Sequence, residues 1–328
     1  MEKIKYICVV DTVYSLSLYL LYQPFEAYDK TLFFVGNVIP ENISSKFKHV
    51  FRIDYKTEKF YSKINLICLQ LQIRKYRDII RNSTIYAQDH LVFSGIVIGK
   101  NDYILLEDAP NIFTIYKTIS FMNPAPLNSF KARLGNKVFK KLFLEHSLGR
   151  NQQCKSIIYT SPTDSDSELL IDKEAIYVDL KKIWNESDRE KKRFIHSLFD
   201  IDEDIFNTYK NNNIIIFSQP LSHDCKLSDE EICDIYSPYI EKYKNDGIII
   251  KPHPRDTFNY SKFYPNITIM NTKAPMQILS AMGLSFKKAI TVCSSAISSM
   301  DSDCEIIWIG ASANPKILAV YGDIKCPK

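Results

Sequence analysis

Glycine is scarce in this chain: only 9 of its 328 residues are glycine, beside 14 prolines. Turns must therefore depend on Asn, Asp, Ser and Pro, which favour turns through side-chain hydrogen bonds or a fixed φ. The sequence also lacks a phosphate-binding P-loop, a GxGxxG dinucleotide turn, a GxSxG nucleophile elbow and an HExxH zinc helix. A catalytic site must consequently be sought in less widespread combinations of residues.

Paired cysteine motifs are absent as well. The eight cysteines are spread along the chain with no CxxC pair and no zinc-like spacing, at positions 8, 68, 154, 225, 233, 293, 304 and 326. Several lie in apolar, strand-like segments, where a free cysteine behaves as a small hydrophobic residue. We therefore expect a reduced, cytoplasmic protein rather than a disulfide-stabilised secreted one.

Long hydrophobic runs are missing too, since no segment reaches the roughly 18 uncharged apolar residues of a membrane-spanning helix. The apolar run near the N-terminus is interrupted by Asp11 and Thr12, and no small-residue cleavage site follows it. That pattern predicts a buried strand followed by a turn and a helix, not a signal peptide.

Excess charge is small, with a formal net charge of +4. The basic clusters at residues 137–141 and 189–193 are mixed with apolar or acidic residues, which favours solvated helix faces. A nucleic-acid-binding domain would be more basic, so we expect no nucleic-acid partner. Weak peripheral association with an anionic membrane, at the inner face of the cell membrane, stays open as an alternative.

The chain has the composition of a globular protein, and its length suits two domains. Helical patterns at residues 15–22 and 62–78 lie between apolar runs that predict strands at residues 4–10, 31–35, 50–53, 84–87 and 103–106. Because these runs are continuous rather than alternating, they indicate a parallel sheet covered on both faces.

Helical patterns then dominate, at residues 112–120, 136–145 and 190–199. Strand patterns return at residues 213–218, 247–250, 268–270, 289–292 and 305–309, and Ser228 is a suitable N-cap for a helix over residues 229–243. We therefore expect an α/β protein with an N-terminal domain at 1–150, a helical linker region at 151–210 and a second parallel-sheet domain at 211–328.

The most informative motif is Lys251-Pro252-His253-Pro254-Arg255, which directly follows a predicted strand. Open α/β sheets bind ligands at the carboxyl ends of their strands. The two prolines stiffen the turn, while Lys251 and Arg255 add positive charge. A protonated His253 could give a proton to a leaving phosphate, so we interpret the motif as part of a phosphate site rather than a plain surface loop.

Ser294 and Ser295 follow another predicted strand, where a helix is expected to begin. Free backbone N–H groups and hydroxyls at such a position bind anions. A simple N-cap would explain one of these serines, but a neighbouring His253 turn favours phosphate binding.

Carboxylates after strands are candidate bases. Glu107 and Asp108 follow the strand at 103–106 and suit a general base or a clamp for an acceptor hydroxyl, although a polar turn explains them equally well. Asp224, after the strand at 213–218, is a second candidate, and Asp229 a third, with a helix-dipole role favoured for Asp229. Three acidic tripeptides, beginning at Asp164, Asp202 and Asp301, resemble metal-binding DxD motifs, but none follows a convincing strand of the first domain, so we expect no metal site.

Taken together, these motifs resemble the bacterial sialyltransferases of glycosyltransferase family 52, the lipooligosaccharide and capsule group. The resemblance rests on Ile7-Cys8-Val9-Val10-Asp11-Thr12, Leu105-Leu106-Glu107-Asp108, Ser218-Gln219-Pro220-Leu221, the Lys-Pro-His-Pro-Arg run and the Ser294-Ser295 pair. It implies the glycosyltransferase-B architecture, in which two Rossmann-like domains face a cleft, and a homodimer.

The resemblance further implies transfer of sialic acid from CMP-sialic acid to a galactose-terminated glycan, with inversion and without a metal or other cofactor. His253 would be the acid or phosphate donor, Ser294 and Ser295 the phosphate cradle, and Asp108 or Asp224 the base. The expected substrate-binding residues are Lys251, Ser294, Ser295, Gln277, Glu107 and Arg255.

Two residues depart from the family pattern. Ala109 replaces the glycine of an acidic-acidic-Gly motif, and Gln277 replaces a glutamate expected at the ribose hydroxyls. These changes keep two alternatives open: a related transferase that uses a UDP-sugar or CDP-glycerol, and a catalytically degenerate member that binds a glycan or nucleotide.

Overall fold

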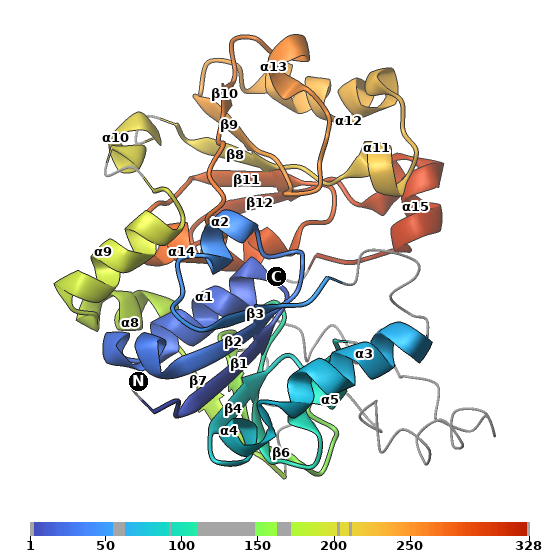
Figure 1. Cartoon of the computed structure of the whole chain (residues 1–328). Coiled ribbons are helices and arrows are strands. Elements are labelled where there is room, and N and C mark those ends of the chain that lie inside the picture. Colours follow the sequence, from blue (N-terminus) through green and yellow to red (C-terminus); the bar gives the residue numbers. More distant parts are fainter. Residues whose placement is uncertain are drawn as a thin grey trace. The chain divides into compact units, whose positions relative to one another are not determined.

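The computed structural model describes residues 3–54, 63–91, 93–110, 148–162, 172–201, 204–209 and 212–326. The chain divides into two compact units, Met1–Arg193 and Phe194–Lys328. Each unit contains one all-parallel sheet with helices on its faces, as the sequence predicts (Figure 1).

The first sheet has seven strands in the order β3-β2-β1-β4-β5-β6-β7, and every neighbouring pair is parallel. The strands are β1 (Tyr6–Val10), β2 (Thr31–Val35), β3 (Val50–Arg52), β4 (Thr84–Ala87), β5 (Tyr103–Leu106), β6 (Cys154–Tyr159) and β7 (Glu174–Tyr177). All five residues of β2 are buried, which explains its uninterrupted apolar sequence.

Helices cover both faces of this sheet (Figure 1). The helices of this unit are α1 (Val13–Tyr22), η1 (Phe25–Lys30), α2 (Glu41–Ser44), α3 (Lys63–Arg74), α4 (Arg77–Arg81), α5 (Ser94–Ile98) and α8 (Leu180–Glu186), and the division between the two units falls within α9 (Arg189–Leu198). On one face, Tyr19 of α1 packs edge-on against Phe33 and Tyr86. On the other, Ile73 of α3 and Val97 of α5 belong to a continuous apolar core with the strands.

The second sheet has five parallel strands in the order β10-β9-β8-β11-β12. The strands are β8 (Ile214–Phe217), β9 (Ile248–Lys251), β10 (Thr268–Ile269), β11 (Lys288–Thr291) and β12 (Glu305–Trp308). The helices are α10 (Ile205–Tyr209), α11 (Leu221–Asp224), α12 (Asp229–Lys242), α13 (Tyr260–Phe263), α14 (Met276–Ala281), η6 (Ser295–Ser299), η7 (Ala311–Ala313) and α15 (Pro315–Tyr321). Ile232 and Tyr236 of α12 pack into the core on one face, and Figure 1 shows α14 on the other.

The start of α12 follows the predicted capping chemistry. The Ser228 hydroxyl accepts the Glu231 N–H, and the Glu231 side chain accepts the Ser228 N–H in return, which completes a capping box. Three acidic residues in the first turn interact favourably with the positive end of the helix dipole.

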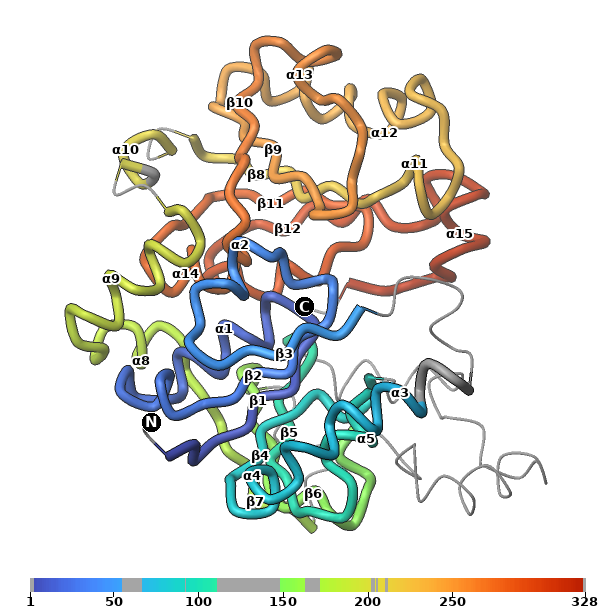
Figure 2. The backbone as a smooth tube through the Cα atoms, in the orientation of Figure 1, coloured from blue at the N-terminus to red at the C-terminus, as the bar shows by residue number. Residues whose placement is uncertain are grey.

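The segment at 151–210, which the sequence assigns to a helical linker, departs from expectation. It contributes β6 and β7 to the first sheet, beside β5 (Figure 2). The β7 strand lies at the sheet edge and is largely exposed, so its sequence carries no apolar run. The predicted helix at 62–78 is divided into α3 and α4, and those at 112–120 and 136–145 lie outside the described residues.

The cysteine and membrane expectations can be compared with the described residues. All eight cysteines lie within the described ranges and are free, which agrees with the expected absence of disulfides. In the part of the chain that the structure describes, no helix is both long enough and apolar enough to cross a membrane.

Candidate active site

The carboxyl edge of the second sheet gathers several of the predicted residues. Ser218 follows β8, the turn at residues 252–255 follows β9, and Ser294 lies beyond the end of β11. Since β8 pairs with both β9 and β11 and all three strands are parallel, these segments end at the same edge. This is where open α/β sheets bind ligands.

Ser218 and Asp256 hold the backbone of the His253 turn. The Ser218 hydroxyl accepts the His253 N–H at 3.1 Å and donates to the Asp256 carboxylate at 2.5 Å. Asp256 also accepts the Tyr260 hydroxyl at 2.9 Å and the Phe258 N–H at 3.1 Å. The sequence singled out neither residue for this role, although Asp256 directly follows the motif and Ser218 ends a strand.

The His253 ring has a defined orientation. Its Nδ1 accepts the Arg255 N–H at 3.1 Å, so in the neutral ring the proton lies on Nε2. Burial and the nearby Arg255 charge lower the pKa of His253. The sequence predicts that His253 must be protonated to act as a donor, but in the structure the neutral ring already presents an Nε2–H donor.

Lys251 ends β9 beside this turn. Its Nζ donates to the Thr272 carbonyl oxygen at 3.3 Å, and burial lowers its pKa to about 8. The amine of this half-buried lysine therefore still carries a positive charge in most molecules at pH 7.

Arg255 and Asp224 form a bidentate salt bridge, with N–O distances of 3.1 and 3.0 Å. Asp224 also accepts the Tyr321 hydroxyl at 2.9 Å and lies 2.8 Å from Nδ1 of His223. Burial opposes the charge on Asp224, but the bonds from His223 and Tyr321 and the Arg255 charge outweigh it and lower its pKa. A carboxylate engaged in this way is suited to orienting Arg255 and poorly suited to accepting a proton.

Ser294 and Ser295 begin a short 3-10 turn, η6, rather than the α-helix that the sequence predicts. Thr291 supports the turn, because its hydroxyl donates to the Phe217 carbonyl and accepts the Ser294 N–H, both at 3.0 Å. The Ser294 hydroxyl accepts the Ala296 N–H at 3.3 Å and keeps its own proton for a ligand. Ser295 is exposed.

Gln277 lies in the first turn of α14 and is half-buried. Helix α14 packs against η6, so the predicted ribose residue and the predicted phosphate serines lie on neighbouring elements. The second unit thus brings His253, Lys251, Ser294, Ser295 and Gln277 to one region.

Gln88, after the central strand β4, organises the carboxyl edge of the first sheet. Its Oε1 accepts the Asp11 N–H at 2.6 Å and the Thr12 N–H at 3.2 Å, and its Nε2 donates to Asp108. One side chain therefore connects the ends of β1 and β5. Sequence reasoning missed Gln88, because the residue gains its role only from the strand order β1-β4-β5.

The two adjacent carboxylates differ in exposure. Glu107 is only 1% exposed, accepts the hydroxyls of Tyr14 and Thr160, and helps raise the pKa of Tyr14, although burial is the larger cause. The Asp108 side chain is 27% exposed, with His90 Nε2 at 3.8 Å from its Oδ2. Glu107 therefore supports the fold, and Asp108 is the carboxylate of the pair that a ligand can reach.

Ala109 is tolerated at the position where the family pattern has glycine. The non-glycine residues with positive φ among those described are Leu148, Asp200 and Lys226, so Ala109 needs no left-handed conformation. Its side chain packs against the core of the first unit.

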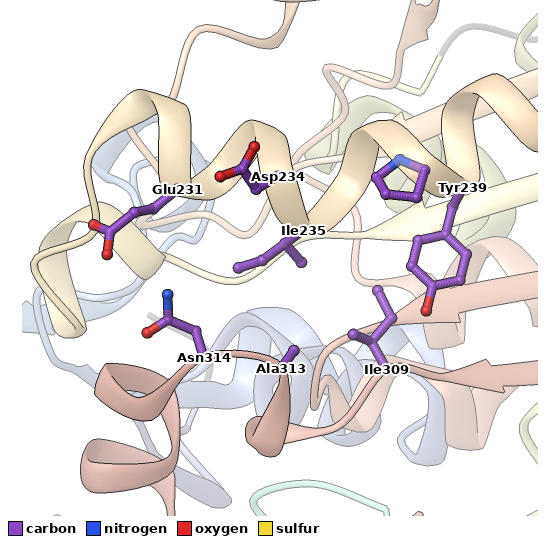
Figure 3. Close-up of a pocket in the computed structure, with 8 residues that line it drawn as sticks. Glu231, Asp234, Ile235, Tyr239, Ile309, Ala313 and Asn314 are labelled. Atoms are coloured by element: carbon purple, nitrogen blue, oxygen red, sulfur yellow. The ribbon is translucent and has the colours of Figure 1, made fainter.

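A separate groove of about 380 Å³ lies between α12 and the connection from β12 to α15. Figure 3 shows Ile235 and Tyr239 of α12 facing Ile309 and Ala313 across it. None of the predicted site residues lines this groove. The Glu231 carboxylate at its end pairs with Lys316 at 2.8 Å.

The acidic tripeptides do not gather around a common point in the described residues. Asp301 and Asp303 are exposed on the loop before β12, while Asp164, Asp166 and Asp202 lie outside the described residues. Within the described ranges, no group of three or more His, Cys, Asp or Glu side chains could hold a metal ion.

Comparison with known proteins gives a family match. The model of glycosyltransferase family 52 matches residues 27–310. An uncharacterized protein of Haemophilus influenzae is 27% identical over 289 residues, which cover 88% of this chain and 87% of that protein.

Solved structures share the fold at low identity. The sialyltransferase of Photobacterium damsela has a TM-score of 0.61 at 11% identity, over 99% of this chain and 80% of that one. The α/β-galactoside α-2,3-sialyltransferase of Photobacterium phosphoreum has a TM-score of 0.54 at 12% identity, over 93% and 90%. The UDP-GlcNAc 2-epimerase of Methanocaldococcus jannaschii has a TM-score of 0.52 at 12% identity, over 98% and 93%, so these similarities support the glycosyltransferase-B fold alone.

Proposed function

The chain belongs to glycosyltransferase family 52, and from this membership we propose that it is an inverting sialyltransferase. It moves sialic acid from CMP-sialic acid to a terminal galactose of a cell-surface glycan. The observation that carries the proposal is the His253 turn, where a fixed Nε2–H donor lies at a strand end beside Lys251.

The donor half of the reaction suits the second unit. The bond between the sialic acid carbon and the phosphate oxygen breaks, and CMP leaves with its electron pair. The negative charge that develops on the one phosphate can be stabilised by Nε2–H of His253, the Lys251 amine and the hydroxyls of Ser294 and Ser295. With these groups supplying the compensating charge and hydrogen bonds, the reaction proceeds without a metal ion.

The acceptor half of the reaction suits the first unit. The acceptor oxygen forms the new bond to the sialic acid carbon from the opposite face, and its proton passes to a carboxylate. We assign that carboxylate to Asp108, because Asp224 is held by Arg255, Tyr321 and His223. Since the transition state resembles an oxocarbenium ion, the base need only take the proton late.

The test is turnover of CMP-sialic acid with a galactoside in the presence of EDTA. We expect activity in the wild type and a loss of about 100-fold to 10,000-fold in kcat for His253→Ala. Ser302→Ala, an exposed serine of the same unit, serves as the control. Full activity of His253→Ala, or full dependence on a divalent metal, would reject the proposal.

A second candidate is a transferase or related enzyme that uses a UDP-sugar or CDP-glycerol. The structural similarity to a UDP-GlcNAc 2-epimerase favours it, since the same fold holds UDP-GlcNAc and UDP in the crystal structure of that protein. Thermal-shift measurements with CMP, UDP and CDP separate the two: stabilisation by UDP but not by CMP selects this candidate. Slow hydrolysis of CMP-sialic acid without an acceptor argues against a non-catalytic binding protein.

A further inference from the structure

The imidazole of His90 lies beside the candidate base. Its Nε2 is 3.8 Å from Oδ2 of Asp108, and the two side chains are 30% and 27% exposed. Sequence reasoning did not single out His90, because its relation to Asp108 arises only from the pairing of β4 with β5.

The two residues before His90 fix its position. Gln88 connects the ends of β1 and β5 through its side chain. Asp89 is only 3% exposed and accepts the Tyr103 hydroxyl at 2.7 Å, together with the N–H groups of Leu148 at 2.6 Å and Gly149 at 2.8 Å. Because both residues are tied to other elements, the backbone of His90 has little freedom to move away from Asp108.

The geometry leaves room for a ligand to interact with both groups. A distance of 3.8 Å is too long for a direct hydrogen bond. Gln88 already donates to Oδ1 of Asp108, whereas no described residue donates a hydrogen bond to Oδ2. Since Nε2 of His90 faces a carboxylate, the form with a proton on Nε2 is favoured there. A donor and an acceptor therefore lie side by side, which is complementary to two neighbouring hydroxyls.

We propose that His90 and Asp108 together recognise two adjacent hydroxyls of the acceptor sugar, a clamp that rests on the proposed sialyltransferase function. Asp108 Oδ2 takes the proton of the attacking hydroxyl, whose oxygen bonds to the sialic acid carbon as CMP leaves with the electron pair of the broken bond. His90 Nε2–H donates to the oxygen of the neighbouring hydroxyl. The attacked position is then a secondary ring hydroxyl of galactose, because the primary hydroxyl has no hydroxyl on the adjacent carbon.

The test compares a galactoside with its analogues that lack one hydroxyl beside the attacked position. For the wild type, we expect kcat/KM to be about tenfold lower with the analogue that removes the His90 partner. His90→Ala should lower kcat/KM for the galactoside by about tenfold and leave no difference between the two acceptors. His90→Gln, whose amide N–H can donate, should restore part of the difference.

If His90 had only a structural role, His90→Ala would lower kcat/KM for both acceptors by the same factor. An unchanged ratio of the two kcat/KM values in His90→Ala therefore overturns the clamp. Equal use of all analogues by the wild type, or transfer to the primary hydroxyl, overturns it too. CMP affinity and thermal melting show whether each variant is folded, and His90→Gln serves if His90→Ala is not. Release of CMP from the donor without an acceptor separates the two proposals. If it persists while no galactoside is used, the clamp fails alone; if both this release and transfer to the galactoside are absent, the proposed function fails.

Discussion

The backbone N–H of Arg255 donates a hydrogen bond to Nδ1 of His253 across 3.1 Å. The contact joins two residues of one short turn, yet it decides which nitrogen of the neutral ring is a hydrogen-bond donor. Because Nδ1 accepts, the neutral ring carries its proton on Nε2. The proline-stiffened turn therefore provides a neutral donor, and the positive charge of the site comes from Lys251 and Arg255.

The pH dependence of stability follows from this arrangement. Burial and the Arg255 charge lower the pKa of His253 in the folded state below the value of about 6.5 in the unfolded chain. Between these two values the unfolded chain binds more protons, so the stability that His253 contributes is present above about pH 6.5 and is lost as the pH falls.

NMR titration of the His253 ring should show the neutral Nε2–H form and a pKa below the ordinary range. Denaturation of the wild type and His253→Gln between pH 5 and 8 measures the stability effect. The difference in unfolding free energy between the two proteins should shrink at low pH. A pKa above the ordinary range would contradict the assignment.

Ser218 should support the His253 turn. It is 1% exposed, and Ser218→Ala leaves the His253 N–H and the Asp256 carboxylate each without this partner. We expect the free energy of unfolding to fall by about 1–3 kcal/mol and CMP affinity to fall with it.

The matched control is Ser222→Ala. Its hydroxyl makes only an exposed contact of 3.2 Å with Thr257, so a change within about 0.5 kcal/mol is expected. Chemical denaturation and CMP titration measure both effects. Wild-type CMP affinity in Ser218→Ala would show that the turn does not depend on this hydroxyl.

Asp108 and Asp224 should differ in kinetic phenotype. Asp108→Asn removes the proposed base and should lower kcat by about 100-fold to 10,000-fold, with CMP affinity unchanged. Asp224→Asn weakens the ion pair to Arg255 and should lower CMP affinity, with less than about a tenfold loss in kcat.

Steady-state kinetics together with CMP titration distinguishes these outcomes. The reverse pattern, in which Asp224→Asn removes turnover and retains CMP affinity, would transfer the base role to Asp224. Tyr321→Phe, which removes one hydrogen bond to Asp224, should show a weaker form of the Asp224→Asn phenotype.

Much of the fold follows from the sequence because parallel strands are buried on both faces. The structure has β2, β4 and β5 at the predicted residues 31–35, 84–87 and 103–106. The strand β7 (Glu174–Tyr177) could not be found in this way, since it is a largely exposed edge strand without an apolar run. A hydrophobic sequence pattern indicates which residues are buried, and an exposed edge strand has few buried residues.

The site is less accessible to sequence reasoning. The sequence predicts that His253, Ser294 and Asp108 lie at the carboxyl ends of strands. This prediction depends only on which strand each residue follows. Their partners depend on contacts between distant segments: Ser218 meets Asp256 across 38 positions, and Gln88 meets Asp11 across 77. Such pairs require the strand order, which no local pattern supplies.

Lys191 departs from the exposure predicted for its cluster, whereas Arg189 and Arg193 are exposed as expected. The basic cluster at residues 189–193 predicts a solvated helix face, but Lys191 is 5% exposed. Its Nζ donates to the carbonyl oxygens of Leu21 at 2.6 Å and Gln23 at 2.8 Å, at the C-terminal end of α1. A buried amine thus satisfies carbonyl groups that the helix end leaves unpaired.

The stability contribution of Lys191 should rise with pH. Burial lowers its pKa to about 8, whereas the unfolded chain has a value of about 10.4. Between these values the unfolded chain binds more protons, so the contribution to the unfolding free energy increases as the pH rises through this window. Lys191→Met should lower the free energy of unfolding by about 1–3 kcal/mol at pH 8, because the two carbonyls lose their donor. The measurement is denaturation of the wild type, Lys191→Met and the exposed control Lys182→Met at pH 8 and pH 10. The difference in unfolding free energy between the wild type and Lys191→Met should be larger at pH 10. An equal difference at both pH values would contradict the assignment.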